Sequence, residues 1–306
     1  MSKPSGAIDM TRGKPINLML RFALPMMIGS IFQSLYSMVD SAVLGRFVGS
    51  HALAAIGATT STTGLILLLA TGVTSAISIV LSQYVGANDT DRVRKGIVAS
   101  GWITLLLGVV LGLISVFAAR PLMQLLKTPE DVIDMSVLYI QIVCGCGIAQ
   151  FAYNAAASIL RALGDSKTPL YFLILCSILN VILDLISVIG LNMGVAGVAV
   201  ATVGSQAISA VICILVMFRK YPNLMPKRHT LRPDMPVSLK IFGMGAQMAL
   251  QSLFLSVGMM VITRVINGYG SNVVAAFTVG SNVQNLAVMP VSYTHLRAHE
   301  TSLHLV

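Results

Sequence analysis

The stretch "SLYSMVDSAVLG", residues 34–45, places a single aspartate, Asp40, in a run that otherwise suits lipid. Moving a carboxylate into bilayer hydrocarbon costs roughly 2.5–3.5 kcal/mol on insertion scales. The rest of the chain has the same character, because 56% of its 306 residues are hydrophobic and only 10% are charged. A soluble domain carries about 25% charged residues. The composition therefore predicts a polytopic membrane protein in which Asp40 has a special role.

Apolar runs of the length needed to span a bilayer, roughly 17–25 residues, recur along the chain. They predict seven helices and a short eighth, at residues 17–45, 53–84, 97–119, 133–160, 169–190, 195–218, 238–266 and 273–290. In the link before residue 169, we expect Thr168 to cap the following helix and Pro169 to occupy its first turn. The four cysteines all lie inside apolar runs, and we interpret them as reduced packing residues.

The Lys and Arg residues predict the orientation. Fifteen of the 20 lie in the N-terminal segment and in the links at 86–97, 161–168 and 219–240, which share one side of the membrane. Four lie on the other side, and this asymmetry places the N-terminus in the cytoplasm. The net charge of +9 is thus a marker of topology, and we expect no nucleic-acid partner.

The chain also repeats itself at a shift of 218 residues. Gln33, Ser34 and Leu35 then align with a second Gln-Ser-Leu at 251–253, and Arg46 aligns with Arg264. Two units of six helices would insert with the same orientation, an arrangement found in transporters. The predicted fold class is an all-α polytopic membrane protein built from two parallel six-helix repeats, of which the first lobe and the start of the second are present.

These features divide the chain into five parts. We predict a cytoplasmic N-terminus (1–15), an N-terminal lobe of six transmembrane helices (16–218), a basic cytoplasmic linker (219–237) and the first two helices of a C-terminal lobe, the second of them incomplete (238–290). Residues 291–306 resemble translated sequencing adaptor, so we interpret them as a non-native tail and the chain as C-terminally truncated. The tail's three histidines do not share a helical face, and we expect no metal site there.

Two acidic residues lie well inside predicted spans. At 1.5 Å per helical residue, Asp40 lies ~28 Å from Arg21 at the inner surface, and Asp184 lies ~25 Å from Lys167. Asn180 is one turn from Asp184 on the same face. Thr202 lies ~12 Å in from the outer surface by the same rise. Four polar groups from three helices thus share the outer half of the membrane, and they form one cluster if those helices adjoin.

Polar residues inside a membrane often do no more than hold helices together. Two carboxylates at matched depth differ, because each is costly unpaired and the two repel each other when both are ionised. Holding a proton or binding a cation resolves both problems. We therefore interpret the cluster as a coupling-ion site for H⁺ or Na⁺. We expect no other metal and no cofactor.

The order and spacing of several motifs over residues 10–290 resemble the multidrug and toxic compound extrusion (MATE) transporters, closest to the bacterial branch named after a DNA-damage-inducible member. The motifs are "PMMIGSIFQSLYSMVDSAVLGRFVG" (25–49), "SQYVGA" (82–87), "RALGDSKTP" (161–169), "LNVILD" (179–184) and "AAFTVGSNVQNLAVMP" (275–290). The resemblance implies two six-helix lobes in the bacterial inner membrane, monomeric when full length. It implies alternating-access export of amphipathic, often cationic compounds in exchange for H⁺ or Na⁺, and no enzymatic activity.

Carried over by position, the family's ion site falls on the residues that depth had grouped: Asp40, Asn180, Asp184 and Thr202. The resemblance also implies supporting hydrogen bonds from Tyr139 and Asn154. Pro25 matches a proline associated with bending of the first helix. It removes a backbone donor, which leaves the carbonyl of Arg21 without its helical partner.

Three alternatives remain open. A flippase for lipid-linked saccharides would share the architecture but would usually line its cavity with cations, and no cationic residue is predicted mid-span. An intramembrane aspartyl protease would use Asp40 and Asp184 in a Gly-x-Gly-Asp setting, yet the chain's one Gly-Asp pair, Gly164-Asp165, lies in a predicted loop. Finally, the 306-residue chain as written is a non-functional fragment if the missing lobe is essential.

Overall fold

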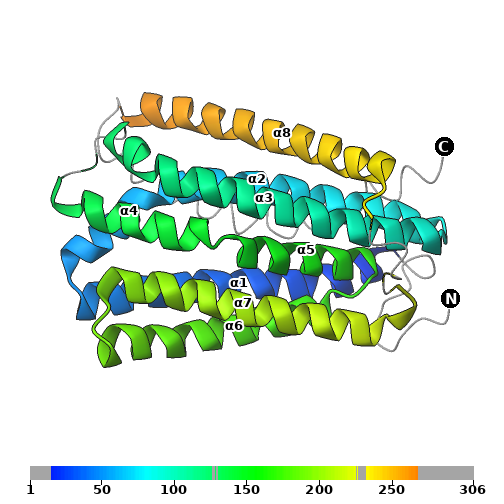
Figure 1. Ribbon diagram of the computed structural model, residues 1–306, viewed down its shortest axis with the longest axis horizontal. Helices are drawn as coiled ribbons and strands as arrows, with labels where there is room; N and C mark the ends of the chain where they lie inside the picture. Colours follow the sequence, from blue (N-terminus) through cyan, green and yellow to red (C-terminus); the bar gives the residue numbers. More distant parts are fainter. Residues whose placement is uncertain (1–14, 126–127, 129, 225, 227–231, 268–306) are drawn as a thin grey trace.

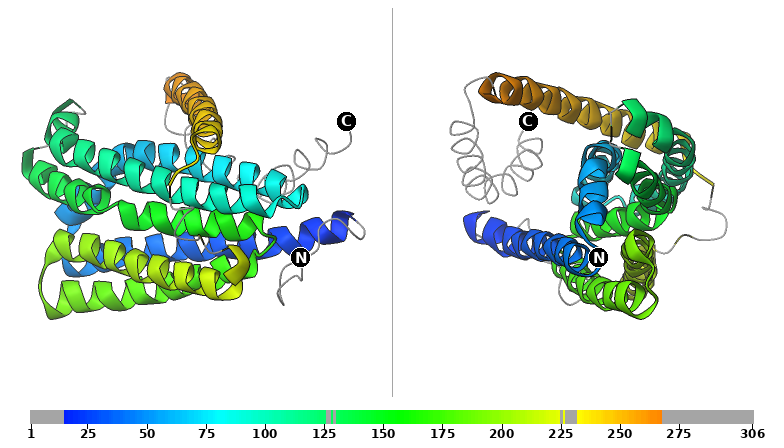
Figure 2. Two further views of the ribbon diagram at one scale, coloured as in Figure 1. Left: turned by 45° about the vertical axis from the view of Figure 1, so that its right-hand side comes forward. Right: turned by 90° about the vertical axis from the view of Figure 1, so that its left-hand side faces the viewer.

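A computed structural model describes residues 15–125, 128, 130–224, 226 and 232–267. Most of the described helices run alongside one another, α8 crosses them obliquely, and none of the described residues is in a strand (Figures 1 and 2). The helices are α1 (Pro15–Phe47), α2 (Ser50–Gly86), α3 (Thr90–Leu125), α4 (Glu130–Gly145), α5 (Ile148–Ala162), α6 (Lys167–Leu185), α7 (Gly194–Lys220) and α8 (Met235–Asn267). A π-helical turn, η1 (Ile186–Gly190), extends α6, and a 3₁₀ turn, η2 (Pro222–Leu224), follows α7. The predicted all-α fold class is confirmed.

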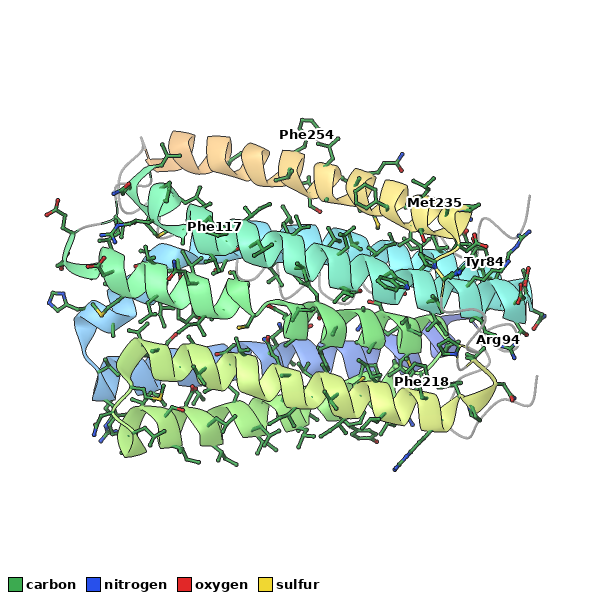
Figure 3. The ribbon with its side chains drawn as sticks, viewed as in Figure 1. Tyr84, Arg94, Phe117, Phe218, Met235 and Phe254 are labelled. Atoms are coloured by element: carbon green, nitrogen blue, oxygen red, sulfur yellow. The ribbon has the colours of Figure 1, made fainter. Side chains whose placement is uncertain are left out.

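Four helices in the described part are long and apolar enough to cross a membrane, or five when α4 and α5 count as one bent span. Large apolar side chains face outward on the bundle, including Phe117 of α3, which is 78% exposed, and Phe254 of α8, which is 68% exposed (Figure 3). An apolar surface of this extent is unsuited to water but matches lipid. The predicted ranges 17–45 and 238–266 correspond to α1 and α8, while 273–290 and the tail lie outside the described residues.

The span predicted at 133–160 is not one straight helix. It breaks between α4 and α5, which meet at an angle of 43°. Gly145 and Gly147 flank the break, and glycine is a common cause of sharp kinks. Gly112 of α3 lies so close to this point that a Cβ atom on it would be 2.8 Å from the carbonyl oxygen of Gly145. The break therefore lets α3 approach the backbone of α4 closely.

Helix α8 packs on α2 and α3 at one side of the bundle, and α6 packs against α1 and α7 at the other (Figures 1 and 2). The largest buried cluster joins α2, α3, α5 and α7 and includes Ile77, Leu81 and Leu160. A smaller cluster surrounds Leu44 near the end of α1. These contacts hold α1, α6 and α7 together, which is the group that carries the predicted ion-site residues.

One end of the bundle, here called the basic end, carries Arg92, Arg94, Lys95, Lys220 and Lys240. Tyr84 and Arg94 mark this end in Figure 3. Its cations contact neighbouring elements: Lys240 donates to Gln83 across 3.0 Å, and Lys95 lies 3.3 Å from Asp234. The opposite end carries the exposed contact between His51 and Asp131, at 3.1 Å, and the exposed ion pair Arg120–Asp134.

The turn between α5 and α6 shows how "RALGDSKT" folds. Gly164 adopts φ 84°, a left-handed conformation that favours glycine. The amides of Gly164 and Asp165 donate to the carbonyls of Arg161 and Leu160, the two hydrogen bonds of a Schellman motif. The prediction that Thr168 caps α6 is wrong: Asp165 accepts from the Thr168 amide at 3.1 Å and from its hydroxyl at 2.6 Å.

Candidate functional site

Three of the four predicted ion-site residues are almost fully buried. Asp184 is 0% exposed, Asn180 is 1% and Thr202 is 6%, while Asp40 is half-buried. Asn180 and Asp184 occupy successive turns of α6, and Thr202 comes from α7. Because α6 packs against both α1 and α7, these helices bring the four residues into one region of the bundle.

The carboxyl groups of Asp40 on α1 and Asp184 on α6 are close neighbours. Two neighbouring carboxyl groups can share a hydrogen bond only when one of them carries a proton, since an ionised carboxylate is an acceptor only. Within the described residues, no donor group reaches either carboxylate oxygen of Asp184 or Oδ1 of Asp40. The pair therefore lacks the donors that normally stabilise buried carboxylates.

Asn180 and Thr202 add further oxygen atoms. The amide oxygen and nitrogen of Asn180 are both buried without a protein partner in the described part of the chain. The Thr202 hydroxyl donates to the carbonyl of Val198 at 2.9 Å, which leaves its lone pairs free to accept or to coordinate. Carboxylate, amide and hydroxyl oxygens are ligands that hard cations prefer. The arrangement can therefore hold either a proton or a small cation.

The π-helical turn η1 begins two residues after Asp184. Such turns occur mostly as local insertions in α-helices and are frequent at functional sites. Gly197 of α7 lies against this turn, and a Cβ atom on it would be 3.0 Å from Cβ of Ser187. The missing side chain at Gly197 lets η1 approach α7 closely and so sets the position of Asp184 relative to that helix.

The other predicted residues, Tyr139, Asn154 and Pro25, do not all lie in the same place in the structure. Tyr139 of α4 packs against the Leu44 cluster, beside the end of α1 that carries Asp40. Asn154 of α5 and Pro25 of α1 instead line a cavity of about 160 Å³ together with Asn180 and Thr202. Helix α1 is continuous through Pro25. Asp40 and Asp184 are not among the residues that line this cavity.

Several cavity residues were not predicted from the sequence. They are Gln33, Gln150, Tyr153, Arg161, Cys176 and Gln206. A usable signal was present, because Gln150 and Asn154, like Thr202 and Gln206, are spaced i, i+4 and so share a helical face. The interpretation of all four cysteines as packing residues is wrong for Cys176, which lines the cavity, and for Cys146, which is exposed.

Comparison with known proteins places this arrangement in a family. Residues 25–186, which include the acidic pair and Asn180, match the MatE family. The chain belongs to the MatE family. It is a multi-pass membrane protein, and the resemblance inferred from its motifs is confirmed. "Probable multidrug resistance protein YpnP" of Bacillus subtilis is 31% identical over 93% of this chain and 63% of its own length.

Solved MatE-like structures share the fold. A MOP superfamily transporter from Pyrococcus furiosus superposes with a TM-score of 0.87 at 25% identity, over 98% of this chain and 66% of that one. A MATE protein crystallised in a bent conformation also gives 0.87 at 25% identity, over 95% and 65%. The chain thus spans about two thirds of these structures and 63% of YpnP.

Proposed function

We propose that this MatE protein is a secondary antiporter that exports amphipathic, often cationic compounds in exchange for H⁺ or Na⁺. The observation that carries the proposal is the pair Asp40–Asp184, which joins α1 and α6. Oδ1 of Asp40 and both carboxylate oxygens of Asp184 are buried without a protein donor in the described part of the chain. Ionised carboxylates inside a membrane carry a high free-energy cost. Binding a proton or a small cation lowers that cost, so such a pair is suited to binding an ion reversibly. The name of YpnP supports multidrug compounds as the substrate class.

The proposed orientation has the N-terminus and the basic end in the cytoplasm of a bacterial inner membrane. The excess of Lys and Arg at the basic end supports this orientation. The division into an N-terminal lobe (16–218), a basic linker (219–237) and the start of a second lobe (238–290) belongs to the same proposal, as does a monomeric full-length protein. In the structure, α7 ends at Lys220 and α8 begins at Met235, close to the proposed linker boundaries.

In the proposed cycle, Asp40 and Asp184 take up a proton or Na⁺ from the outer side. Neutralising the pair removes the repulsion between the two carboxylates, so the packing of α1 against α6 changes and the hold on a cationic substrate weakens. Release of the ion into the cytoplasm restores the negative charge of the Asp40–Asp184 pair. One charge crossing 100 mV provides about 2.3 kcal/mol, enough to bias two packing states without ATP.

Dye efflux from a host that lacks its own exporters tests this proposal. We compare the chain, the Asp40→Asn variant and the matched control Asp134→Asn, with the amount in the membrane measured for each. Asp134 is 77% exposed and pairs with Arg120 at the opposite end of the bundle. We expect ethidium efflux driven by a proton or Na⁺ gradient, lost in Asp40→Asn and retained in the control. Gradient-independent efflux, no efflux by the wild type, or unchanged efflux in Asp40→Asn contradicts the proposal.

A further inference from the structure

Two cations beside the basic end have no side-chain partner within the described part of the chain. Lys167 is the first residue of α6, Arg219 is the last but one of α7, and both are exposed. Their neighbour Lys220 differs, because it pairs with the carboxylate of Asp165 at 2.6 Å. That carboxylate is 0% exposed and also accepts from Thr168. Lys167 and Arg219 are therefore available to an anion from outside the protein.

The contact between α6 and α7 places these two cations on one face. The ammonium of Lys220 lies 3.3 Å from the hydroxyl of Thr168, so the end of α7 meets the beginning of α6 and the two helices are antiparallel. The residue before each contacting one is rotated by about 100° around its own helix. In facing antiparallel helices, these rotations turn both side chains to the same side of the pair. Lys167 and Arg219 thus share one outer face.

The same face is apolar deeper in the membrane. One turn from the cations, Tyr171 of α6 is 64% exposed, and Leu215 of α7 is also exposed. Eleven residues from the cations, Ile178 and Ile208 are exposed on the same two helices. Eleven residues correspond to ~16 Å along a helix, which is close to half of the ~30 Å hydrocarbon thickness. Charge, an aromatic ring and hydrocarbon therefore follow one another over the depth of one lipid leaflet.

The arrangement of the helices leaves this face to lipid. Helix α8, which leads into the rest of the chain, packs on α2 and α3 at the opposite side of the bundle from α6 (Figures 1 and 2). Phe218, the residue before Arg219, marks the end of α7 in Figure 3. The exposure of Lys167, Tyr171 and Leu215 shows that no described element covers the face.

We propose that the face formed by Lys167, Tyr171, Leu215 and Arg219, here called the lipid face, binds one anionic phospholipid. The guanidinium of Arg219 and the ammonium of Lys167 hold the phosphate, since both groups form charge-assisted hydrogen bonds with phosphate oxygens. The acyl chains lie along the apolar part of the same face. A zwitterionic head group brings its own cation toward these two positive charges, so the face favours a lipid with net negative charge. The choice of the cytoplasmic leaflet rests on the proposed orientation, but the binding itself does not.

Quenching of a tryptophan at position 171 tests the proposal. The chain has one tryptophan, Trp102, so Trp102→Phe/Tyr171→Trp places the single fluorophore on the lipid face. The full chain is reconstituted in phosphatidylcholine vesicles that contain a small fraction of phosphatidylglycerol or phosphatidylcholine with brominated acyl chains, which quench on contact. Each cation near a membrane surface contributes about fivefold to binding of anionic lipid. We expect brominated phosphatidylglycerol to associate at least about tenfold more strongly than brominated phosphatidylcholine.

Two pairs of substitutions that remove the same charge separate a site from general surface charge. Adding Lys167→Gln and Arg219→Gln should abolish the preference for phosphatidylglycerol. Adding Arg92→Gln and Lys95→Gln is the matched control, because these cations lie on α3 and already pair with Asp89, Asp91 and Asp234. We expect the control to keep the preference within about twofold of the parent, since the lipid face is unchanged.

Three results would overturn the proposal. The first is equal quenching by the two brominated lipids, and the second is an equal effect of the two pairs of substitutions. The third is loss of the preference on adding inorganic phosphate but not chloride at the same ionic strength, which would make a soluble anion the occupant. The measurement uses neither an ion gradient nor a transported dye. Its failure is therefore distinguishable from a failure of the antiport proposal in the efflux assay.

Discussion

The Nζ atom of Lys220 lies 2.6 Å from Oδ2 of Asp165, a residue 55 positions earlier in the chain. The contact joins the last residue of α7 to the turn before α6. Asp165 is 0% exposed, and its carboxylate also caps α6 through Thr168. One ion pair thus fixes the basic ends of two helices whose other halves carry Asp184 and Thr202.

Removing Lys220 should destabilise the protein. Lys220→Met leaves the buried Asp165 carboxylate without its counter-ion, and breaking a buried pair in this way costs about 3 kcal/mol. Reversible unfolding in mixed detergent micelles measures the loss. Lys95→Met is the control, because Lys95 is exposed and its ion pairs with Asp91 and Asp234 should contribute little. Equal effects of the two substitutions would contradict a stabilising role for the Lys220–Asp165 pair.

Asp184→Asn should make the protein more stable but abolish ion-driven efflux. The substitution keeps the side-chain shape but removes a buried charge that no donor in the described residues stabilises. We expect the free energy of unfolding to rise by about 1 kcal/mol, as when a strained functional site is relieved, while gradient-driven efflux is lost. A large loss of stability would instead show that the Asp184 carboxylate is structural.

The crossing of α2 and α8 depends on the absence of a side chain at Gly72. A Cβ atom there would lie 2.8 Å from the backbone nitrogen of Ala249 and 2.9 Å from the carbonyl oxygen of Gly245. Gly72→Ala should therefore separate the helices and destabilise the protein by about 1–3 kcal/mol. Gly64→Ala on the same helix meets nothing within 4 Å and should stabilise it by roughly 0.5–1 kcal/mol. Opposite signs in unfolding measurements would confirm the close crossing.

The close approach of α3 to the α4–α5 break can be tested in the same way. A Cβ atom on Gly112 would meet the carbonyl oxygen of Gly145 at 2.8 Å, whereas one on Gly101 of the same helix meets open space. We expect Gly112→Ala to lower the free energy of unfolding by about 1–3 kcal/mol and Gly101→Ala to leave it unchanged or raised. If both variants unfold alike, the two helices do not meet at Gly112.

The amino-acid sequence was sufficient to predict the class of protein and most helix positions. It also predicted a similar depth for Asp40, Asn180, Asp184 and Thr202, which stays a prediction. These properties are local: an apolar run must match the bilayer thickness, and a regular rise converts residue number into depth. A similar predicted depth suggested that residues from different helices form one cluster. Depth alone does not show that α1, α6 and α7 are neighbours, because many arrangements of the helices are compatible with the same depths.

Only the tertiary structure decided the features that depend on residues distant in the chain. Asp165 replaces Thr168 as the cap of α6 and is held by Lys220 of α7. The 133–160 span bends where Gly112 of α3 meets Gly145. Arg161, which by sequence belongs to a predicted cytoplasmic link, lines the same cavity as Asn180. Each depends on a contact between helices, and packing of that kind is specified by the whole fold and not by any one segment.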